Sequence, residues 1–189
     1  KKGERVAIMM PNLLQYPVSL FGTLRAGMTV VNVNPLYTAR ELEYQLKDSG
    51  ARTVVVVENF ANTLQQVVGN TPVEHVVTTR VGDMCPVPQR WIVNFVVANV
   101  KGMVPHWRID GAIDFAAALR RGAAGRLQPV ELTHDDVAFL QYTGGTTGVP
   151  KGAQLTHGNI VANLQQASTW ISRELKEGAE TIIAALPLY

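Results

Sequence analysis

The stretch from Gln141 to Gly152, QYTGGTTGVPKG, carries residue types that can bind a polyphosphate. Gly144, Gly145 and Gly148 tolerate positive φ angles and leave their backbone N–H groups uncovered. Successive N–H groups in such a turn form a concave binding site for an anion. We therefore expect this stretch to be a loop that holds phosphate oxygens through backbone donors.

Four side chains of the same loop strengthen this prediction. Three hydroxyls can donate hydrogen bonds to phosphate oxygens or bind a cation, and one ammonium group places positive charge at the far end of the loop. These side chains belong to Thr143, Thr146, Thr147 and Lys151. The alternative interpretation is a flexible glycine-rich hairpin turn, which needs neither the clustered threonines nor the closing Pro-Lys-Gly.

The loop differs from a Walker A loop, whose pattern G-x-x-x-x-G-K-[ST] starts a helix at the lysine. Here the glycine before Lys151 lies three positions back, Pro150 directly precedes the lysine, and Gly152 directly follows it. The next residues, GAQLT, alternate with a period of two and predict a strand. The phosphates would therefore lie against a loop between two strands, which argues against P-loop GTPases and kinases.

Read as a whole, YTGGTTGVPKG resembles the phosphate-loop signature [YF]-T-[SG]-G-[ST]-T-G-x-P-K-G of the adenylate-forming enzymes. Further segments are similar to bacterial long-chain fatty acid–CoA ligases, and the resemblance covers essentially the whole chain. They are GERVAIMMPN, AGMTVVNVNPLYTARELEYQLKDSGA, VNFVVANVKGMVPHW and LPLY. One departure is Gly144, where many relatives have serine, so the hydroxyl at that position is dispensable or is replaced by a neighbour.

The resemblance implies an acid–thiol ligase that uses ATP, Mg²⁺ and coenzyme A as a co-substrate. A long-chain fatty acid would be activated to acyl-adenylate and then transferred to coenzyme A, releasing AMP and pyrophosphate. Lys151 and Thr146 would be catalytic, and Thr146 would also face the metal. The implied ATP-phosphate contacts are Tyr142, Thr143, Gly144, Gly145, Thr146, Thr147, Gly148, Pro150, Lys151 and Gly152. We favour packing beneath the loop over direct nucleotide contact for Tyr142.

Two other functions fit the same motif. One is another adenylate-forming ligase, acting on an aryl or amino acid. The other is a non-catalytic nucleotide-binding module that keeps the fold. A decayed phosphate site should lack the lysine or the threonines, and this sequence keeps both.

Strand-like and helix-like segments alternate over residues 1–80. Strands are predicted at RVAIMM, MTVVNVN, RTVVVVE and VEHVVTT, and the segments between them predict helices. This alternation predicts an α/β fold of mostly parallel sheets with flanking helices. By resemblance, it is part of the large N-terminal domain of an adenylate-forming enzyme.

Capping residues predict where these helices begin and end. We expect Asn12 to cap the first helix and Gly27 to follow its end. Thr38 and Glu41 predict a capping box for the second helix, which should close at Gly50. The third predicted helix covers residues 59–69.

Residues 81–126 interrupt the alternation, and we interpret them as an insert. Ile92, Phe95, Val96, Val100 and Met103 can share one helical face. This region also contains Arg90, Lys101, Arg108, Trp91 and Trp107. The helix could touch an anionic membrane surface or guide an acyl chain, or it could simply pack on the sheet with the tryptophans filling space.

Residues 127–189 form the phosphate-loop segment. A strand is predicted at HDDVAFLQYT, a helix capped by Thr156 follows the loop, and TIIAAL near the end is strand-like. Both ends of the chain lie inside regular patterns, so we expect a partial AMP-binding domain without the C-terminal remainder. We therefore expect the fragment alone to be inactive.

Composition limits the partners and the compartment. The net charge of +2 and the pI of about 8.8 are too mild to indicate nucleic acid. Cys85 is the single cysteine, so no internal disulfide or cysteine zinc site is expected, and a cytoplasmic setting fits. No apolar stretch reaches the roughly 18 residues of a membrane span. Peripheral contact with the cytoplasmic face of the inner membrane and a homodimer are further hypotheses.

Overall fold

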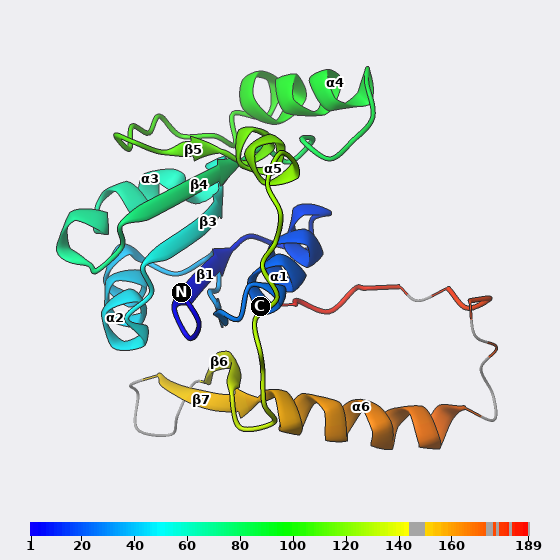
Figure 1. The fold of residues 1–189 in the computed structure, drawn as a ribbon. Coiled ribbons are helices and arrows are strands. Elements are labelled where there is room, and N and C mark those ends of the chain that lie inside the picture. The colour runs from blue at the N-terminus through cyan, green and yellow to red at the C-terminus, as the bar shows by residue number, and fades with distance from the viewer. Residues whose placement is uncertain (144–149, 173–175, 177, 182, 189) are drawn as a thin grey trace.

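The computed structural model describes residues 1–143, 150–172, 176, 178–181 and 183–188. These residues form a seven-stranded sheet with the order β5-β4-β3-β1-β2-β6-β7 (Figure 1). Neighbouring strands are parallel except for β6 and β7, which are antiparallel. The predicted α/β fold with a mostly parallel sheet is therefore confirmed.

The elements have the following bounds. The strands are β1 (Arg5–Met9), β2 (Thr29–Asn32), β3 (Thr53–Val57), β4 (His75–Thr79), β5 (Ile113–Asp114), β6 (Val137–Thr143) and β7 (Lys151–Thr156). The α-helices are α1 (Gln15–Arg25), α2 (Ala39–Ser49), α3 (Ala61–Gln65), α4 (Gln89–Phe95), α5 (Phe115–Ala123) and α6 (His157–Ile171). Short 3₁₀-helices cover Glu58–Phe60 and Val68–Asn70, and a π-helix covers Val96–Val100.

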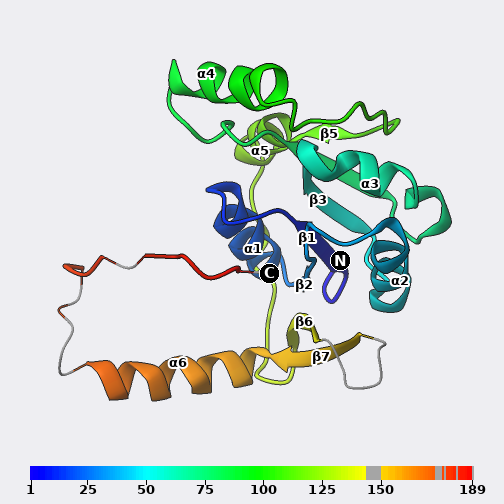
Figure 2. The same ribbon diagram turned by 180° about the vertical axis from the view of Figure 1, so that it is seen from behind.

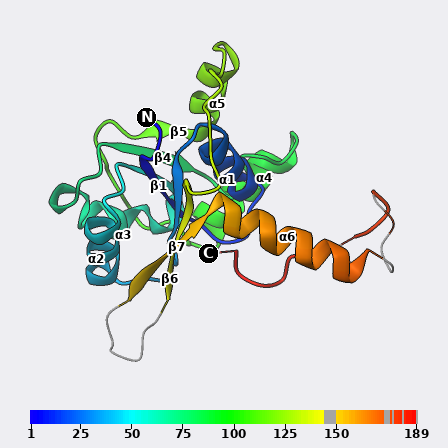
Figure 3. The same ribbon diagram turned by 60° about the horizontal axis from the view of Figure 1, so that its bottom comes forward.

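The central strands are buried on both faces because helices cover both sides of the sheet. Successive residues of β1 point to opposite sides, so Ala7 joins one apolar cluster and Ile8 joins the other. Leu42 and Leu46 of α2 pack in the first cluster, and Tyr16 of α1 packs in the second. Figure 3 shows α2 and α3 on one side of the sheet and α1 on the other.

The predicted ends of the second helix are confirmed. The Thr38 side chain accepts a hydrogen bond from the backbone N–H of Glu41, and the Glu41 carboxylate accepts one from the backbone N–H of Thr38. The helix closes at Gly50, whose φ of 63° is left-handed. Likewise Gly27, with a φ of 73°, follows the end of α1.

The prediction that Asn12 caps the first helix is wrong. α1 begins at Gln15, and its N-cap residue, Leu14, makes no side-chain hydrogen bond. The Asn12 amide is instead engaged by backbone groups of residues 184–188, far away in the sequence. This tertiary contact replaces the local cap.

The single helix predicted over residues 59–69 is also wrong. The chain there forms the short helix α3 between two 3₁₀-helices. Ala61, Leu64 and Val67 are its buried apolar residues, and they lie in α3 and in the turn that follows it.

The strand-like interpretation of residues 181–186 is not confirmed in the described part of that segment, which contains no strand. The backbone carbonyls of Ala184 and Leu186 accept hydrogen bonds from Asn12 rather than from a neighbouring strand. A side chain therefore satisfies groups that a sheet would otherwise pair.

The two segments that follow β5 and β7 differ in how they pack. α5 buries Phe115 against the sheet, whereas none of the residues of α6 is buried. Figures 1 and 2 show α6 extending away from the sheet, while residues 184–188 lie beside α1.

The division of the chain into residues 1–80, 81–126 and 127–189 stays a prediction.

Candidate nucleotide-binding site

Two antiparallel strands flank the predicted phosphate loop. β6 ends at Thr143 and β7 begins at Lys151, and these two residues are register partners. The chain therefore leaves and re-enters the sheet at adjacent positions, as predicted for a loop between two strands. Five predicted phosphate contacts lie outside the described residues, namely Gly144, Gly145, Thr146, Thr147 and Gly148.

The Tyr142 side chain stabilises the base of this hairpin. Its ring packs against the apolar core, and its hydroxyl donates to Asp48 Oδ2 at 2.5 Å. A Cβ atom at Gly152 would lie 3.1 Å from two atoms of this ring, so glycine allows β7 to approach it. Burial raises the pKa of the Tyr142 hydroxyl well above its ordinary value, and the Asp48 carboxylate raises it further. Tyr142 therefore stays a protonated donor.

α2 also contacts the other side of the loop. The Tyr44 hydroxyl donates to the backbone carbonyl of Pro150 at 3.3 Å. The next residue, Lys151, is exposed, so its ammonium group is accessible to an anion at the loop. One helix thus holds both strand ends from which the predicted loop emerges.

A polar chain connects β6 to α1 across the sheet. Asn32 Nδ2, at the end of β2, donates to Gln141 Oε1 at 2.9 Å. Asn32 Oδ1 lies 2.8 Å from the hydroxyl of Tyr16, and Gln45 Nε2 donates to the Asn32 carbonyl at 2.7 Å. Burial raises the pKa of Tyr16 to about 12, although the hydrogen bond with Asn32 opposes that shift. Tyr16 is therefore a neutral donor at physiological pH.

The segment 184–188 joins this chain through Asn12. Asn12 Nδ2 donates to the carbonyls of Ala184 at 2.9 Å and Leu186 at 2.7 Å, and Asn12 Oδ1 accepts from the Leu188 N–H at 3.0 Å. The Leu188 carbonyl also contacts the Tyr16 hydroxyl. These contacts use every hydrogen of the Asn12 amide and hold the segment beside α1, as Figure 2 shows from behind.

These groups converge at one edge of the sheet. Asn12 follows β1, Asn32 ends β2, and Gln141 lies near the end of β6, so all three mark carboxyl ends of mutually parallel strands. Ligands of open α/β sheets bind outside this edge. Residues 184–188 and both ends of the predicted phosphate loop therefore border the same candidate site.

The described part of the site suits an anionic ligand. Lys151 supplies a cation, whereas the carboxylate at the loop base, Asp48, is occupied by Tyr142. Among the described residues, no group of three or more His, Cys, Asp or Glu side chains could hold a metal ion.

Asp136 and His157 take part in structural contacts. Asp136 forms an ion pair with Lys2 at 2.8 Å, and its backbone carbonyl accepts from the N–H of His157 at 2.9 Å. Hydrogen bonds from Lys2 and Thr133 lower the Asp136 pKa. These residues belong to the start of β6 and of α6, at the opposite end of β6 from the loop.

Local sequence patterns do not identify the side chains that support this site. These side chains belong to Asn12, Tyr16, Asn32, Tyr44, Asp48 and Gln141. One signal was available: Asn32 and Gln141 are polar residues inside runs that otherwise read as buried strand. The partners of Tyr44 and Asp48 had no comparable signal, because they lie about a hundred positions away.

Comparison with known proteins agrees with this geometry. Residues 1–189 match the family described as AMP-binding enzyme. The chain is 57% identical over 189 residues to the long-chain-fatty-acid–CoA ligase of Escherichia coli O6:H1, covering 100% of this chain and 34% of that protein. The chain thus spans about a third of the length of the curated relatives it matches.

Solved structures share the fold. A long-chain-fatty-acid–CoA ligase from Archaeoglobus fulgidus is 31% identical with a TM-score of 0.62, over 89% of this chain and 28% of that chain. An anthranilate CoA ligase in complex with anthranoyl-AMP has a TM-score of 0.64 over 87% of this chain and 27% of that chain, and at 24% identity it shows the fold alone. With its loop residues, its sheet and a family match over residues 1–189, the chain belongs to the AMP-binding enzyme family.

Proposed function

We propose that the whole protein activates a long-chain fatty acid with ATP and transfers the acyl group to coenzyme A. The observation that carries this proposal is the 57% identity over all 189 residues to a long-chain-fatty-acid–CoA ligase. The retained loop QYTGGTTGVPKG supports it, since the threonines and Lys151 are the groups that such chemistry needs.

In the first step, a fatty carboxylate oxygen attacks the α-phosphorus of ATP. An aliphatic carboxylate is already ionised at neutral pH, so no general base is needed. The new bond joins this oxygen to phosphorus, and the bond to the pyrophosphate oxygen breaks. The barrier comes from repulsion between two anions and from charge on the leaving pyrophosphate, so the protein must contribute positioning and electrostatic stabilisation.

The loop is proposed to supply both the positioning and the electrostatic stabilisation. Backbone N–H groups from Thr143 to Gly148 and the threonine hydroxyls would hold the β- and γ-phosphates, while the exposed Lys151 ammonium offsets the developing charge. Mg²⁺ would neutralise phosphate charge, with Thr146 as its proposed protein ligand. In the second step, the coenzyme A sulfur attacks the acyl carbon, and the bond to the AMP oxygen breaks.

The second candidate, a ligase for an aryl or amino acid, has weaker support. The anthranilate ligase shares the fold, but its identity of 24% is far below the 57% of the long-chain relative. Acyl-CoA formation by the whole protein should be measured for fatty acids of increasing chain length, with anthranilate and an amino acid as controls. We expect the highest kcat/KM for long chains; a preference for an aryl or amino acid would contradict the proposal.

The setting of the protein also belongs to this proposal. We propose that it works in the cytoplasm, where Cys85 stays reduced, and that it contacts the inner membrane peripherally. Within the described residues, no helix has both the length and the apolar character needed to cross a bilayer. A homodimer is a further hypothesis, and sedimentation of the whole protein would decide it.

A further inference from the structure

The helical segment that follows Pro88 presents large apolar side chains to solvent. α4 and the adjoining π-helix contain no buried residue. Trp91 is 68% exposed and Phe95 is 61% exposed. We define the α4 surface by its exposed apolar residues, which are Trp91, Ile92, Phe95, Val100 and Met103. The apolar face predicted for this segment therefore points away from the sheet, and Trp91 does not fill space inside the fold.

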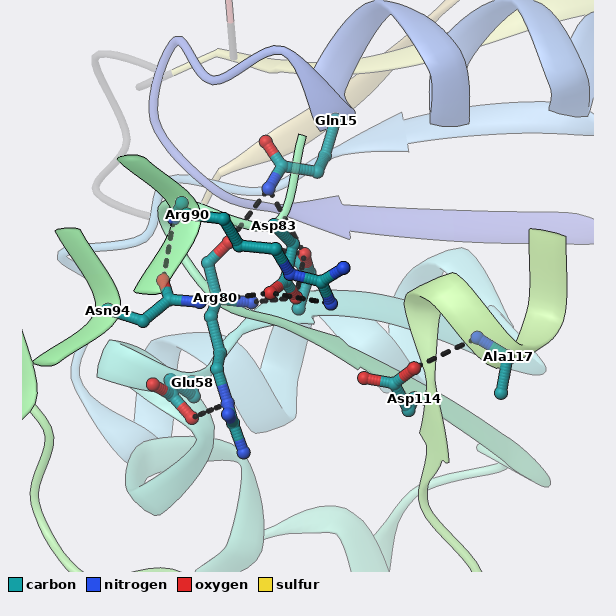
Figure 4. A network of polar contacts seen from close by, with 10 residues as sticks. Gln15, Glu58, Arg80, Asp83, Arg90, Asn94, Asp114 and Ala117 are labelled. Atoms are coloured by element: carbon teal, nitrogen blue, oxygen red, sulfur yellow. Dashed lines mark hydrogen bonds and ion pairs between the residues drawn. The ribbon is translucent and has the colours of Figure 1, made fainter. Parts of the chain in front are cut away.

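A polar cluster on the other side of α4 fixes this orientation (Figure 4). The Asp83 carboxylate, 3% exposed, accepts from the Arg80 N–H at 2.8 Å and the Thr79 hydroxyl at 3.2 Å. It also accepts from Asn94 Nδ2 at 3.1 Å and lies 3.5 Å from the Arg90 guanidinium. Asp83 thus ties α4 to the end of β4.

The approach of α4 to this turn is close. The Gly82 N–H donates to Asn94 Oδ1 at 2.8 Å, and a Cβ at Gly82 would lie 2.9 Å from the Arg90 carbonyl. Behind the turn, Gln15 Nε2 donates to the Arg80 carbonyl at 2.7 Å, which joins the cluster to α1. The polar residues of α4 are therefore bound to the protein, and its apolar residues are left facing outward.

The stretch of sequence that carries this surface is rich in basic residues, of which Arg90 and Arg108 are paired with Asp83 and Asp110. Six Lys or Arg residues and two Asp residues lie between positions 84 and 130, although the whole chain has a net charge of only +2. The basic residues are Arg90, Lys101, Arg108, Arg120, Arg121 and Arg126, and the acidic ones are Asp110 and Asp114. No acidic residue occurs between Met84 and Ile109, the stretch that contains α4 and the π-helix.

We propose that the α4 surface docks on an anionic lipid bilayer, with Trp91 and Phe95 inserted at the interface. Exposed aromatic and aliphatic side chains beside Lys101 are the pattern of interfacial helices. Glu58 also lines the hollow beside Trp91 and Phe95, and its charge is paired with Arg80 at 3.4 Å. A covering protein surface would require matching acidic groups, whereas anionic headgroups attract Lys101 and its basic neighbours at any position. This inference deepens the proposed function, on which its biological role rests: an enzyme held there would meet its fatty acid in the membrane.

Vesicle binding of the whole protein tests the proposal. Wild type should cosediment with phosphatidylglycerol–phosphatidylethanolamine vesicles and bind vesicles of phosphatidylcholine alone much less. The double variant Trp91→Ser with Phe95→Ser should lower the partition coefficient about tenfold or more, because two aromatic side chains no longer insert into the bilayer. Lys101→Glu should lower it about fivefold or more, and added salt should weaken wild-type binding.

Phe21→Ser is the matched control, since Phe21 is a phenylalanine of α1 with 62% exposure against 61% for Phe95. It should leave vesicle binding unchanged. All variants should keep the wild-type kcat with a short, soluble fatty acid, while the double variant loses rate only when a long acid is supplied in vesicles. If the whole protein activates no fatty acid, the proposed function is wrong. The vesicle-binding measurements still test the docking surface in that case.

Three results would overturn the proposal. One is unchanged vesicle binding by the double variant. Another is a melting temperature that falls more for the double variant than for Phe21→Ser without vesicles, which would mean that the rest of the chain covers α4. The third is a lower sedimentation coefficient for the double variant than for wild type without vesicles, which would mean that a second copy of the protein covers α4.

Discussion

Lys151 is the residue whose chemistry matters most to the proposed reaction. It begins β7, pairs in register with Thr143, and is exposed. Hydrogen bonds of Tyr142 and Tyr44 connect both sides of the loop to α2 and fix the start of β7. The Lys151 ammonium group could therefore bind phosphate without a large rearrangement of the β6–β7 hairpin.

Replacing this cation should slow the first chemical step. In the whole protein, we expect Lys151→Ala to lower the rate of acyl-adenylate formation about a hundredfold or more, as loss of one preorganised donor typically costs about 3 to 4 kcal/mol. Fatty acid binding should stay nearly unchanged. Pyrophosphate exchange measures the step, and Lys47→Ala, an exposed lysine paired with Glu43, is the control. Exchange at the wild-type rate would refute the role of Lys151.

Tyr16 predicts a pH dependence of stability. Its folded-state pKa is raised to about 12 by burial, whereas an unfolded tyrosine titrates near 10. The protonated hydroxyl therefore contributes fully to stability below about pH 10, and this contribution is lost as the pH rises toward 12.

Tyr16→Phe should remove this contribution. At pH 8 we expect the variant to be less stable by about 1 kcal/mol, the typical net value of one hydrogen bond. The difference from wild type should shrink between about pH 10 and 12. Urea unfolding at several pH values measures it, and the other tyrosines are common to both proteins. A difference that stays constant or grows with pH would contradict the assignment.

At the scale of elements, the β6–β7 hairpin depends on close contact between a ring and a glycine. The ring of Tyr142 is held by the core and by Asp48, so it cannot move away easily. Since a Cβ at position 152 would lie 3.1 Å from the ring, an alanine there must displace the ring or the strand.

Gly152→Ala in the whole protein should therefore disturb the loop stem. We expect kcat/KM for ATP to fall about tenfold or more, because small displacements of positioning groups are costly in such sites. Gly22→Ala is the control: a Cβ there meets nothing within 4 Å, and alanine suits the interior of α1 better than glycine. Equal kcat/KM for the two variants would show that the ring adapts.

At the scale of the whole molecule, burial is uneven. β1, β2 and β3 supply much of the core, whereas α6 has no buried residue and Trp170 on it is 86% exposed. The chain also spans 34% of the length of its long-chain relative. We infer that the residues described here need further surfaces to complete both packing and site.

Residues 1–189 expressed alone should therefore form no acyl-CoA. In amide hydrogen exchange, we expect β1 and β3 to be protected and α6 to exchange early, because local stability follows buried contacts. Mass spectrometry resolves these segments. Acyl-CoA formation by the isolated residues, or protection of α6 equal to that of β1, would contradict this expectation.

Features that depend on neighbouring residues can be predicted from the sequence. The alternation of strands and helices, the capping box at Thr38, the end at Gly50 and the strand after Lys151 all follow from local pattern and residue type. Where local signals competed with distant contacts, the predictions failed: Asn12 looked like a cap, and residues 59–69 looked like one helix.

Contacts between distant groups depend on the tertiary fold. It brings Asn12 to residues 184–188, Tyr142 to Asp48, and Asn32 to Gln141, across separations of 94 to 176 positions. Residues so far apart share no local periodicity, so their pairing depends on the path of the chain. The outward orientation of the apolar residues of α4 likewise depends on the contact between Asp83 and Asn94. The phosphate-binding chemistry of the loop could be predicted from its sequence, but the distant side chains that support the loop could not.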